Sequence, residues 1–270
     1  MVRTGGAMKP AKRIVWAAGA LVALGLVAGA LAARPVVAAR EDPAHWGKKQ
    51  KAKTKQAAAE GVLVEDQGTL EIKVDGQPAG SEEFEIRESG GAWTARGSAE
   101  IAGENGTKAK VTGKLTLAPD GSPIRYEWTS TSPRKAAAAV EFNGMEAKME
   151  LKLEGATSPY AQEFHFQAPP VVILDNNMYH QYEILARLYD WEHKEPRTYS
   201  VLVPQELTPG SVTAQYGGEQ VMDGQKMDLL RVRSADLEVD LYCDPAQQER
   251  VMRLEVPAAK AVITRQAGKK

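Results

Sequence analysis

Six polar and aromatic side chains gathered in one short stretch are the strongest candidates for a binding site. Carboxylate, amide and imidazole groups beside an apolar surface are typical of a ligand pocket, where a few polar groups orient a mostly apolar ligand. The competing interpretation is helix capping, because Asp and Asn side chains accept hydrogen bonds from the free N–H groups of a helix N-terminus. The sequence leaves both open for Asp175, Asn176, Asn177, Tyr179, His180 and Tyr182.

The histidines and the motifs of known enzymes are the other features that could indicate a metal site or catalysis. His180 and Glu183, three residues apart on a helix, could share a metal ion with Asp175, but a histidine hydrogen-bonded locally at a helix start explains the same pattern. The sequence has no nucleophile elbow, P-loop, zinc-protease motif or dinucleotide fingerprint. We therefore expect no catalytic residues, no metal and no cofactor, and a protein that is not an enzyme.

The single cysteine, Cys243, excludes an intramolecular disulfide and any multi-cysteine metal site. Cys243 falls on the same side of an alternating strand as Leu237, Val239 and Leu241. This position predicts a buried, inert thiol.

One amphipathic helix is predicted over residues 175–191. Met178, Tyr182, Leu185 and Tyr189 are spaced at i, i+4, i+7 and i+11, which places them on one face of an α-helix. In a chain that otherwise reads as β, such a face must pack on a sheet. The simplest arrangement is a helix that packs on, or plugs, the concave side of a curved sheet.

The remainder of the chain after residue 61 has a period of two, which is typical of antiparallel strands with one buried and one wet face. The residues Met145 to Glu154 alternate most strictly, after the hairpin signal Asn143-Gly144. We predict a mainly β fold, an antiparallel meander forming a curved half-barrel or clam. Its strands are expected at 70–74, 84–87, 93–101, 109–117, 124–129, 136–142, 145–154, 198–203, 212–216, 227–232, 237–243, 250–256 and 261–264.

Several positions expected to face inward are small. One interpretation is that they leave room for a cavity or a closely packed insert, and the other is tight sheet packing with glycines at bends. The sequence favours neither for Ala95, Gly97, Ala99, Ala109, Gly113 and Ala147.

The N-terminal residues predict an export signal. A basic start precedes 20 uncharged residues at 14–33, and the small residues of Val37-Ala38-Ala39 follow, as in a secretory signal peptide or an uncleaved membrane anchor. We therefore divide the chain into residues 1–39 as signal or anchor, 40–60 as a basic tether, and 61–265 as a single β domain. A split near Ala168-Pro169-Pro170 is the alternative.

Charge is distributed unevenly along the chain. Of the 34 basic and 35 acidic side chains, residues 61–270 hold 23 and 32, so the body carries a formal charge of −9. A body of that charge repels a phosphate backbone, and we expect no nucleic-acid partner. The candidate partners are a membrane, through residues 14–33 if they are retained, and a lipid or lipidated protein.

These features resemble exported bacterial all-β proteins of unknown function. The resemblance rests on Val172-Ile173-Leu174-Asp175-Asn176-Asn177-Met178-Tyr179-His180-Gln181-Tyr182, on Val203-Pro204-Gln205 and on Val256-Pro257-Ala258-Ala259-Lys260. The architecture is also similar to the half-barrel of periplasmic lipoprotein carriers, without a shared motif. That likeness implies a concave apolar surface for a lipid or acyl chain, in a periplasmic or envelope location. A structural or interaction module with a filled core is the other function that we consider.

Overall fold

The computed structural model describes residues 62–102, 108–131 and 135–267. The signal or anchor predicted at 1–39 and the tether predicted at 40–60 lie outside these residues. Within the described part of the chain, no helix is long and apolar enough to cross a membrane.

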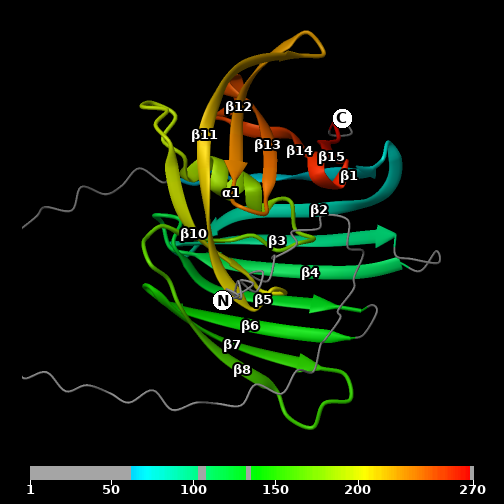
Figure 1. The fold of residues 1–270 in the computed structure, drawn as a ribbon, viewed down its shortest axis with the longest axis vertical. Helices are drawn as coiled ribbons and strands as arrows, with labels where there is room; N and C mark the ends of the chain where they lie inside the picture. The colour runs from blue at the N-terminus through cyan, green and yellow to red at the C-terminus, as the bar shows by residue number, and fades with distance from the viewer. Residues whose placement is uncertain (1–61, 103–107, 132–134, 268–270) are drawn as a thin grey trace, which may run out of the picture.

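One sheet contains all fifteen strands of the described residues, in the order β8-β7-β6-β5-β4-β3-β2-β1-β15-β14-β13-β12-β11-β10-β9. The first eight form an antiparallel meander in chain order, in which β2 to β8 follow one another downward in Figure 1 and β1 lies above them beside β15. They are β1 (Asp66–Val74), β2 (Gln77–Ser89), β3 (Ala92–Ala102), β4 (Lys108–Leu117), β5 (Pro123–Ser130), β6 (Ala136–Asn143), β7 (Glu146–Leu153) and β8 (Tyr160–His165).

The second half of the sheet curls over the first. It carries the helix α1 (Gln181–Leu188), which lies inside the curve behind β11 and β12 in Figure 1. The first and last strands, β1 and β15, are antiparallel neighbours and join the two halves. The strands of this half are β9 (Val171–Ile173), β10 (Arg197–Val203), β11 (Thr208–Met222), β12 (Gln225–Arg233), β13 (Glu238–Asp244), β14 (Arg250–Val256) and β15 (Ala261–Arg265), with short 3-10 helices η2 (Pro245–Gln247) and η3 (Pro257–Ala259).

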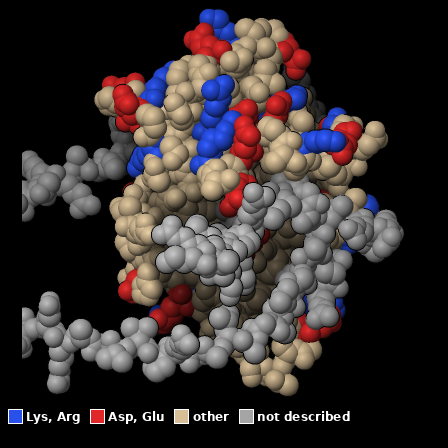
Figure 2. All heavy atoms as spheres, in the orientation of Figure 1, with Lys and Arg blue, Asp and Glu red and all other residues tan. Residues whose placement is uncertain are grey.

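The alternation predicted from the sequence is confirmed. In β7, Ala147 and Met149 are buried and Leu151 and Leu153 are half-buried, whereas the interleaved charged side chains are exposed. Cross-strand ion pairs, such as that of Arg125 with Glu141, lie on the exposed outer face of the sheet. Acidic and basic side chains are interspersed over the upper part of the molecule in Figure 2, without a single-sign patch there.

The predicted helix is wrong in length. Residues 175–180 form turns, and the eight-residue α1 begins after His180, whose side chain makes no capping hydrogen bond. The expected N-cap role of Asp175, Asn176 and Asn177 is therefore not observed. The cause is the burial of Asp175, whose carboxylate is occupied by partners from other parts of the sheet.

The predicted apolar stripe is confirmed, because Met178, Tyr182, Leu185 and Tyr189 are all buried. The helix is immersed rather than amphipathic: Gln181 and Glu183 are also buried. It packs chiefly on β13 and β14.

Two strands were not predicted. β8 follows a turn at 154–159 and is mostly exposed, so its sequence lacks a clear alternation. β9 has three residues and pairs in parallel with β10, which makes it an exception to the antiparallel meander. A strand of three buried residues has no period that a sequence analysis can detect.

Candidate functional site

Two inward-facing glycines create the space for residues 175–182, here called the 175–182 segment. A Cβ atom at Gly97 of β3 would lie 2.6 Å from Cε1 of His180 and 2.7 Å from Oε1 of Glu82. A Cβ atom at Gly113 of β4 would lie 2.8 Å from the hydroxyl of Tyr126 and 3.4 Å from Cγ of Met178. At these positions the small residues make room for an insert, and that insert is the chain itself.

Glu82 of β2 holds the start of the helix. Its Oε2 accepts hydrogen bonds from the backbone N–H groups of Tyr179 (2.7 Å) and His180 (3.3 Å), and its Oε1 is hydrogen-bonded to Nδ1 of His180. The side chains of both Glu82 and His180 are almost completely buried. Phe84 stacks on the His180 ring with 5.7 Å between centroids. The carboxylate that holds the two residues before the helix thus comes from β2, 98 residues before His180.

Asp175 is the centre of a second polar cluster. Its Oδ2 accepts hydrogen bonds from the Tyr126 hydroxyl and from Nε2 of Gln205, each at 2.7 Å. Its Oδ1 accepts from the backbone of Asn177 at 2.9 Å, and its own N–H donates to Oε1 of Gln181 at 2.6 Å. The cluster therefore joins β5, the 175–182 segment and the residues after β10.

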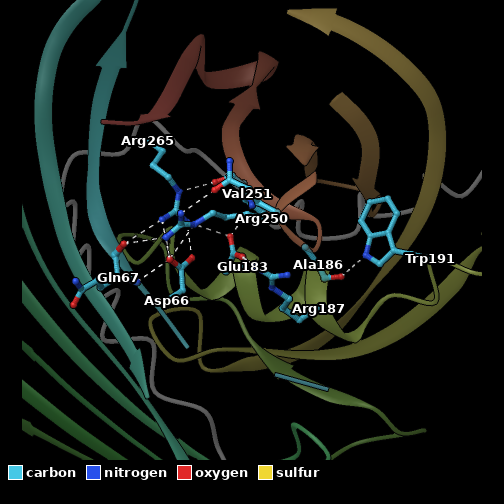
Figure 3. A network of polar contacts seen from close by, with 10 residues as sticks. Asp66, Gln67, Glu183, Ala186, Arg187, Trp191, Arg250, Val251 and Arg265 are labelled. Carbon is cyan, nitrogen blue, oxygen red and sulfur yellow. Dashed lines mark hydrogen bonds and ion pairs between the residues drawn. The ribbon is translucent and has the colours of Figure 1, made fainter. Parts of the chain in front are cut away.

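Glu183 links the helix to the seam between β1, β14 and β15, as Figure 3 shows. Its Oε2 accepts from the backbone of Val251 at 2.8 Å and lies 3.3 Å from Nη2 of Arg265, while its Oε1 accepts from Arg187 at 2.8 Å. Arg265 also donates to Oδ2 of Asp66 at 2.8 Å. Charges from both ends of the domain are paired here inside the curve of the sheet.

These surroundings shift the acidities of the buried groups. Burial raises the pKa of Asp175, although hydrogen bonds from Tyr126, Asn177 and Gln205 oppose that shift. Burial likewise raises the pKa of Glu183, against the charges of Arg187 and Arg265. The pKa of the Cys243 thiol is raised well above its usual value by burial, so it stays protonated, in agreement with the predicted inert thiol.

The six candidate site residues are brought together, but mainly as structural partners. Four of them line a small cavity whose volume suffices for roughly two water molecules. Asp175, Tyr182 and His180 are buried, Tyr179 and Asn177 are half-buried, and Asn176 is exposed with its amide 3.3 Å from Glu206. The cavity is lined by Leu174, Asp175, Asn176, Tyr179, Tyr182, Leu237, Val239 and Val256.

The histidines give no metal centre in this part of the molecule. Among the described residues, no three His, Cys, Asp or Glu side chains are placed to hold a metal ion. His180 bonds to Glu82 rather than to a local partner, and the exposed His165 lies near Glu146, between the buried Phe164 and Phe166.

A second region of the concave side has a different character. On β5 to β8, cross-strand pairs place Trp128 beside Ala138, Ala138 beside Leu151, and Leu151 beside Tyr160. Leu151 and Leu153 are half-buried and Tyr160 is 49% exposed, so apolar surface is open at this end. We call this region the open patch: Leu151, Leu153 and Tyr160, together with the adjoining buried residues Trp128, Ala136 and Ala138.

Comparisons with known proteins bear on the fold. No family model matches the chain, and no curated protein sequence matches it. Among solved structures, the chain is similar to a β-barrel-like protein of a domain of unknown function, DUF1849, from Brucella abortus. The TM-score is 0.50 at 8% sequence identity, over 77% of this chain and 97% of the other. At this identity the likeness extends to the all-β fold alone, and the architecture matched is β-barrel-like rather than that of a named lipoprotein carrier.

Three buried charges escaped the sequence analysis, although a signal for them exists. Glu82 has the same strand parity as Phe84, Asp66 the same as Leu70, and Arg265 the same as Ile263. A charged residue on the apolar side of an alternating strand is expected to have a buried partner. If charged residues, and not only apolar ones, are assigned to the inward or outward side of each alternating strand, all three are placed on the inward side.

Proposed function

We propose that this protein is a non-enzymatic cell-envelope protein that is exported and holds an apolar, lipid-like ligand on the open patch. The observation that carries the proposal is the half-exposed apolar surface of β7 and β8 on the concave side, at Leu151, Leu153 and Tyr160. Exposed apolar surface that is continuous with a core is typical of binding sites rather than of inert surface.

The lining of the open patch supports an apolar ligand. Ala136 and Ala138 are short apolar residues, and Ala138 lies between Trp128 of β5 and Leu151 of β7. The inward positions of β5 to β8 carry no charged residue: the pairing puts Tyr126, Val140, Met149 and Gln162 in one row and Trp128, Ala138, Leu151 and Tyr160 in the next. Transfer of a hydrocarbon chain from water to such an apolar surface is favourable in free energy.

The proposal includes export of the protein and a role without catalysis. The signal-like residues 14–39 support secretion to the envelope, with attachment to a membrane if residues 14–33 are retained. The polar residues 175–182 are occupied in internal hydrogen bonds, which favours a structural role for them over a catalytic one. A lipid or a lipidated protein is the partner that this chemistry fits.

A structural or interaction module without a ligand is the second candidate. The observation that favours it is the filling of the concave side by α1 and the 175–182 segment, which leaves only water-sized space beside Asp175. This candidate predicts no saturable binding of any apolar probe.

The test is a titration of the full chain with an environment-sensitive lipophilic dye. Leu151→Asp places a carboxylate on the open patch and is expected to weaken dye binding at least tenfold. Lys152→Asp, the adjacent residue on the exposed face of the same strand, is the matched control and should bind as the wild type does.

Both variants are first compared by thermal unfolding, so that a folding defect is recognised. Equal binding by the two variants, or no saturable binding by the wild type, would contradict the proposed ligand and support the module without a ligand.

A further inference from the structure

The indole N–H of Trp128 is the feature of the open patch that the proposed function leaves unused. Trp128 lies on β5 between Gly113 of β4 and Ala138 of β6, and it is 5% exposed. Its Nε1 is buried and has no hydrogen-bond partner among the residues that the structure describes. A buried donor without an acceptor costs about 1–3 kcal/mol, so an acceptor supplied by a ligand would be favoured here.

The neighbouring donor on the same strand shows the contrast. The hydroxyl of Tyr126, two residues earlier, donates to Asp175 and is satisfied by the protein. Trp128 belongs to the open patch. Its cross-strand partner on β6 is Ala138, and the next inward residue of β6 in that direction is Ala136. Alanines cannot accept a hydrogen bond through their side chains.

Other buried polar atoms also lack a partner in the described part of the chain. They differ from Trp128 because they belong to the helix or to segments outside β5 to β8. These atoms are on Gln181, Arg187, Tyr199, Gln205 and Glu249.

The charge of the interior restricts the ligand further. The inward positions of β5 to β8 hold no Lys or Arg that could pair with an anionic head group. The carboxylate of Asp175 contacts β5 from the inside, because it accepts the hydrogen bond of Tyr126 two residues before Trp128. A ligand carboxylate would be desolvated there without a counter-ion, whereas a neutral carbonyl would not.

We propose that the open patch takes a neutral acyl ester whose carbonyl oxygen accepts the hydrogen bond of Trp128 Nε1–H. The hydrocarbon chain lies along Ala136, Ala138, Leu151 and Leu153. This inference rests on the proposed function and names the class of its ligand. A neutral ester is distinguished from a free fatty acid by charge, and from a plain hydrocarbon by its acceptor.

Three probes of similar chain length separate these properties: monooleoylglycerol, oleate and octadecene. Each is titrated into the full chain, with displacement of the lipophilic dye as the signal. We expect the ester to bind more tightly than oleate and octadecene. Trp128→Phe keeps the aromatic surface and removes the donor, and it is expected to weaken ester binding about five- to tenfold while octadecene binding changes less than twofold.

The matched control is Trp93→Phe, the same substitution at a buried Trp of β3. Ester binding by this variant should equal that of the wild type. A second measurement needs no substitution: the ¹⁵N–¹H signal of the Trp128 indole should move downfield when monooleoylglycerol is added and should not move with octadecene.

The outcomes separate the two proposals. If ester and octadecene lose affinity equally in Trp128→Phe, or if the indole signal is unmoved by the ester, the hydrogen bond is refuted while apolar binding stands. If oleate binds as tightly as the ester, the preference for a neutral ligand is refuted. If no probe displaces the dye, the proposed function itself fails.

Discussion

The two regions of the concave side differ in how they satisfy polar groups. Around the 175–182 segment, carboxylates from distant strands accept hydrogen bonds from backbone and side-chain donors, and the space above Gly97 and Gly113 is filled. On the open patch, Leu151 and Leu153 are half-buried and Tyr160 is exposed, and the buried Trp128 N–H has no described partner. The same curved sheet thus has one region closed by its own chain and one left open.

Small inward-facing residues therefore have different roles in the two regions. Gly97 and Gly113 serve close contact with an insert, since even one added carbon atom would overlap His180 or Tyr126. Ala136 and Ala138 lie on the open patch beside larger apolar side chains, with Trp128 opposite Ala138 and Leu153 opposite Ala136. Substitutions should therefore have large effects in the first region and small ones in the second.

The largest effect is expected for Glu82→Ala. The substitution leaves the His180 ring and two backbone N–H groups buried without their acceptor, which should cost about 3–5 kcal/mol of unfolding free energy. Urea denaturation measures it. Glu83→Ala removes an exposed carboxylate from the same strand and should be nearly neutral. Similar losses in both variants would show that the buried cluster contributes nothing special.

A direct comparison of the two regions comes from enlarging one residue in each. Gly97→Ala forces a Cβ to within 2.6 Å of the His180 ring and should cost about 1–3 kcal/mol. Ala138→Val adds two carbon atoms on the open patch and should cost less than about 0.5 kcal/mol, because β-branched residues suit strands and the neighbouring Leu151 is only half-buried. A penalty for Ala138→Val as large as that for Gly97→Ala would mean that the patch is filled.

The network between β1 and β15 predicts a dependence on acidity. Burial alone raises the pKa of Asp66, but hydrogen bonds and charges from Arg250 and Arg265 outweigh it and lower the pKa below 3.8. The stabilisation is thus complete above the unfolded pKa and is lost as the pH falls through the folded one. Asp66→Asn should cost about 1.5 kcal/mol at pH 6 and much less at pH 2.

Denaturation curves at a series of pH values test this expectation. A constant difference between wild type and Asp66→Asn from pH 6 to pH 2 would contradict it.

The smallest effect is expected at Glu249, which lies beside the helix network. Burial, with the charge of Asp228 next, raises its pKa from 4.5 to about 6. Because the folded protein holds this proton more tightly, stability falls as the pH rises between these values. Glu249→Gln should remove that decline and gain less than about 1 kcal/mol at pH 7, since the group is half-exposed. Parallel pH profiles for the two proteins would refute the shift.

The sequence predicts the sheet well because half-buried strands have a period that survives without tertiary information. The strands at 93–101, 109–117 and 145–154 agree with β3, β4 and β7 to within a few residues. Where burial is complete or exposure is general, as in β9 and β8, that period is absent and the prediction misses the strand.

The site was predicted less well than the sheet because its partners are distant in sequence. Spacing alone suggests that Asp175 caps its own helix, yet its carboxylate bonds to Tyr126, 49 residues earlier. The hydrogen bonds from Tyr179 and His180 to Glu82 depend on a contact with a distant strand that no local pattern contains. Trp128 likewise reads as an ordinary core residue, and its missing partner is visible only in three dimensions.

The pairing of β1 with β15 places the two ends of the domain side by side in the middle of the sheet, while β8 and β9, close in sequence, form its outer edges. Closing this central seam joins residues almost 200 positions apart, a slow step for any folding chain. The same geometry suits circular permutation: residue 267 could be linked back to residue 62 and the chain opened in the turn at 154–159, leaving every strand pair intact. In the permuted protein, β1 and β15 would be close in sequence. The increase in its folding rate would measure how much pairing these two strands contributes to the folding barrier.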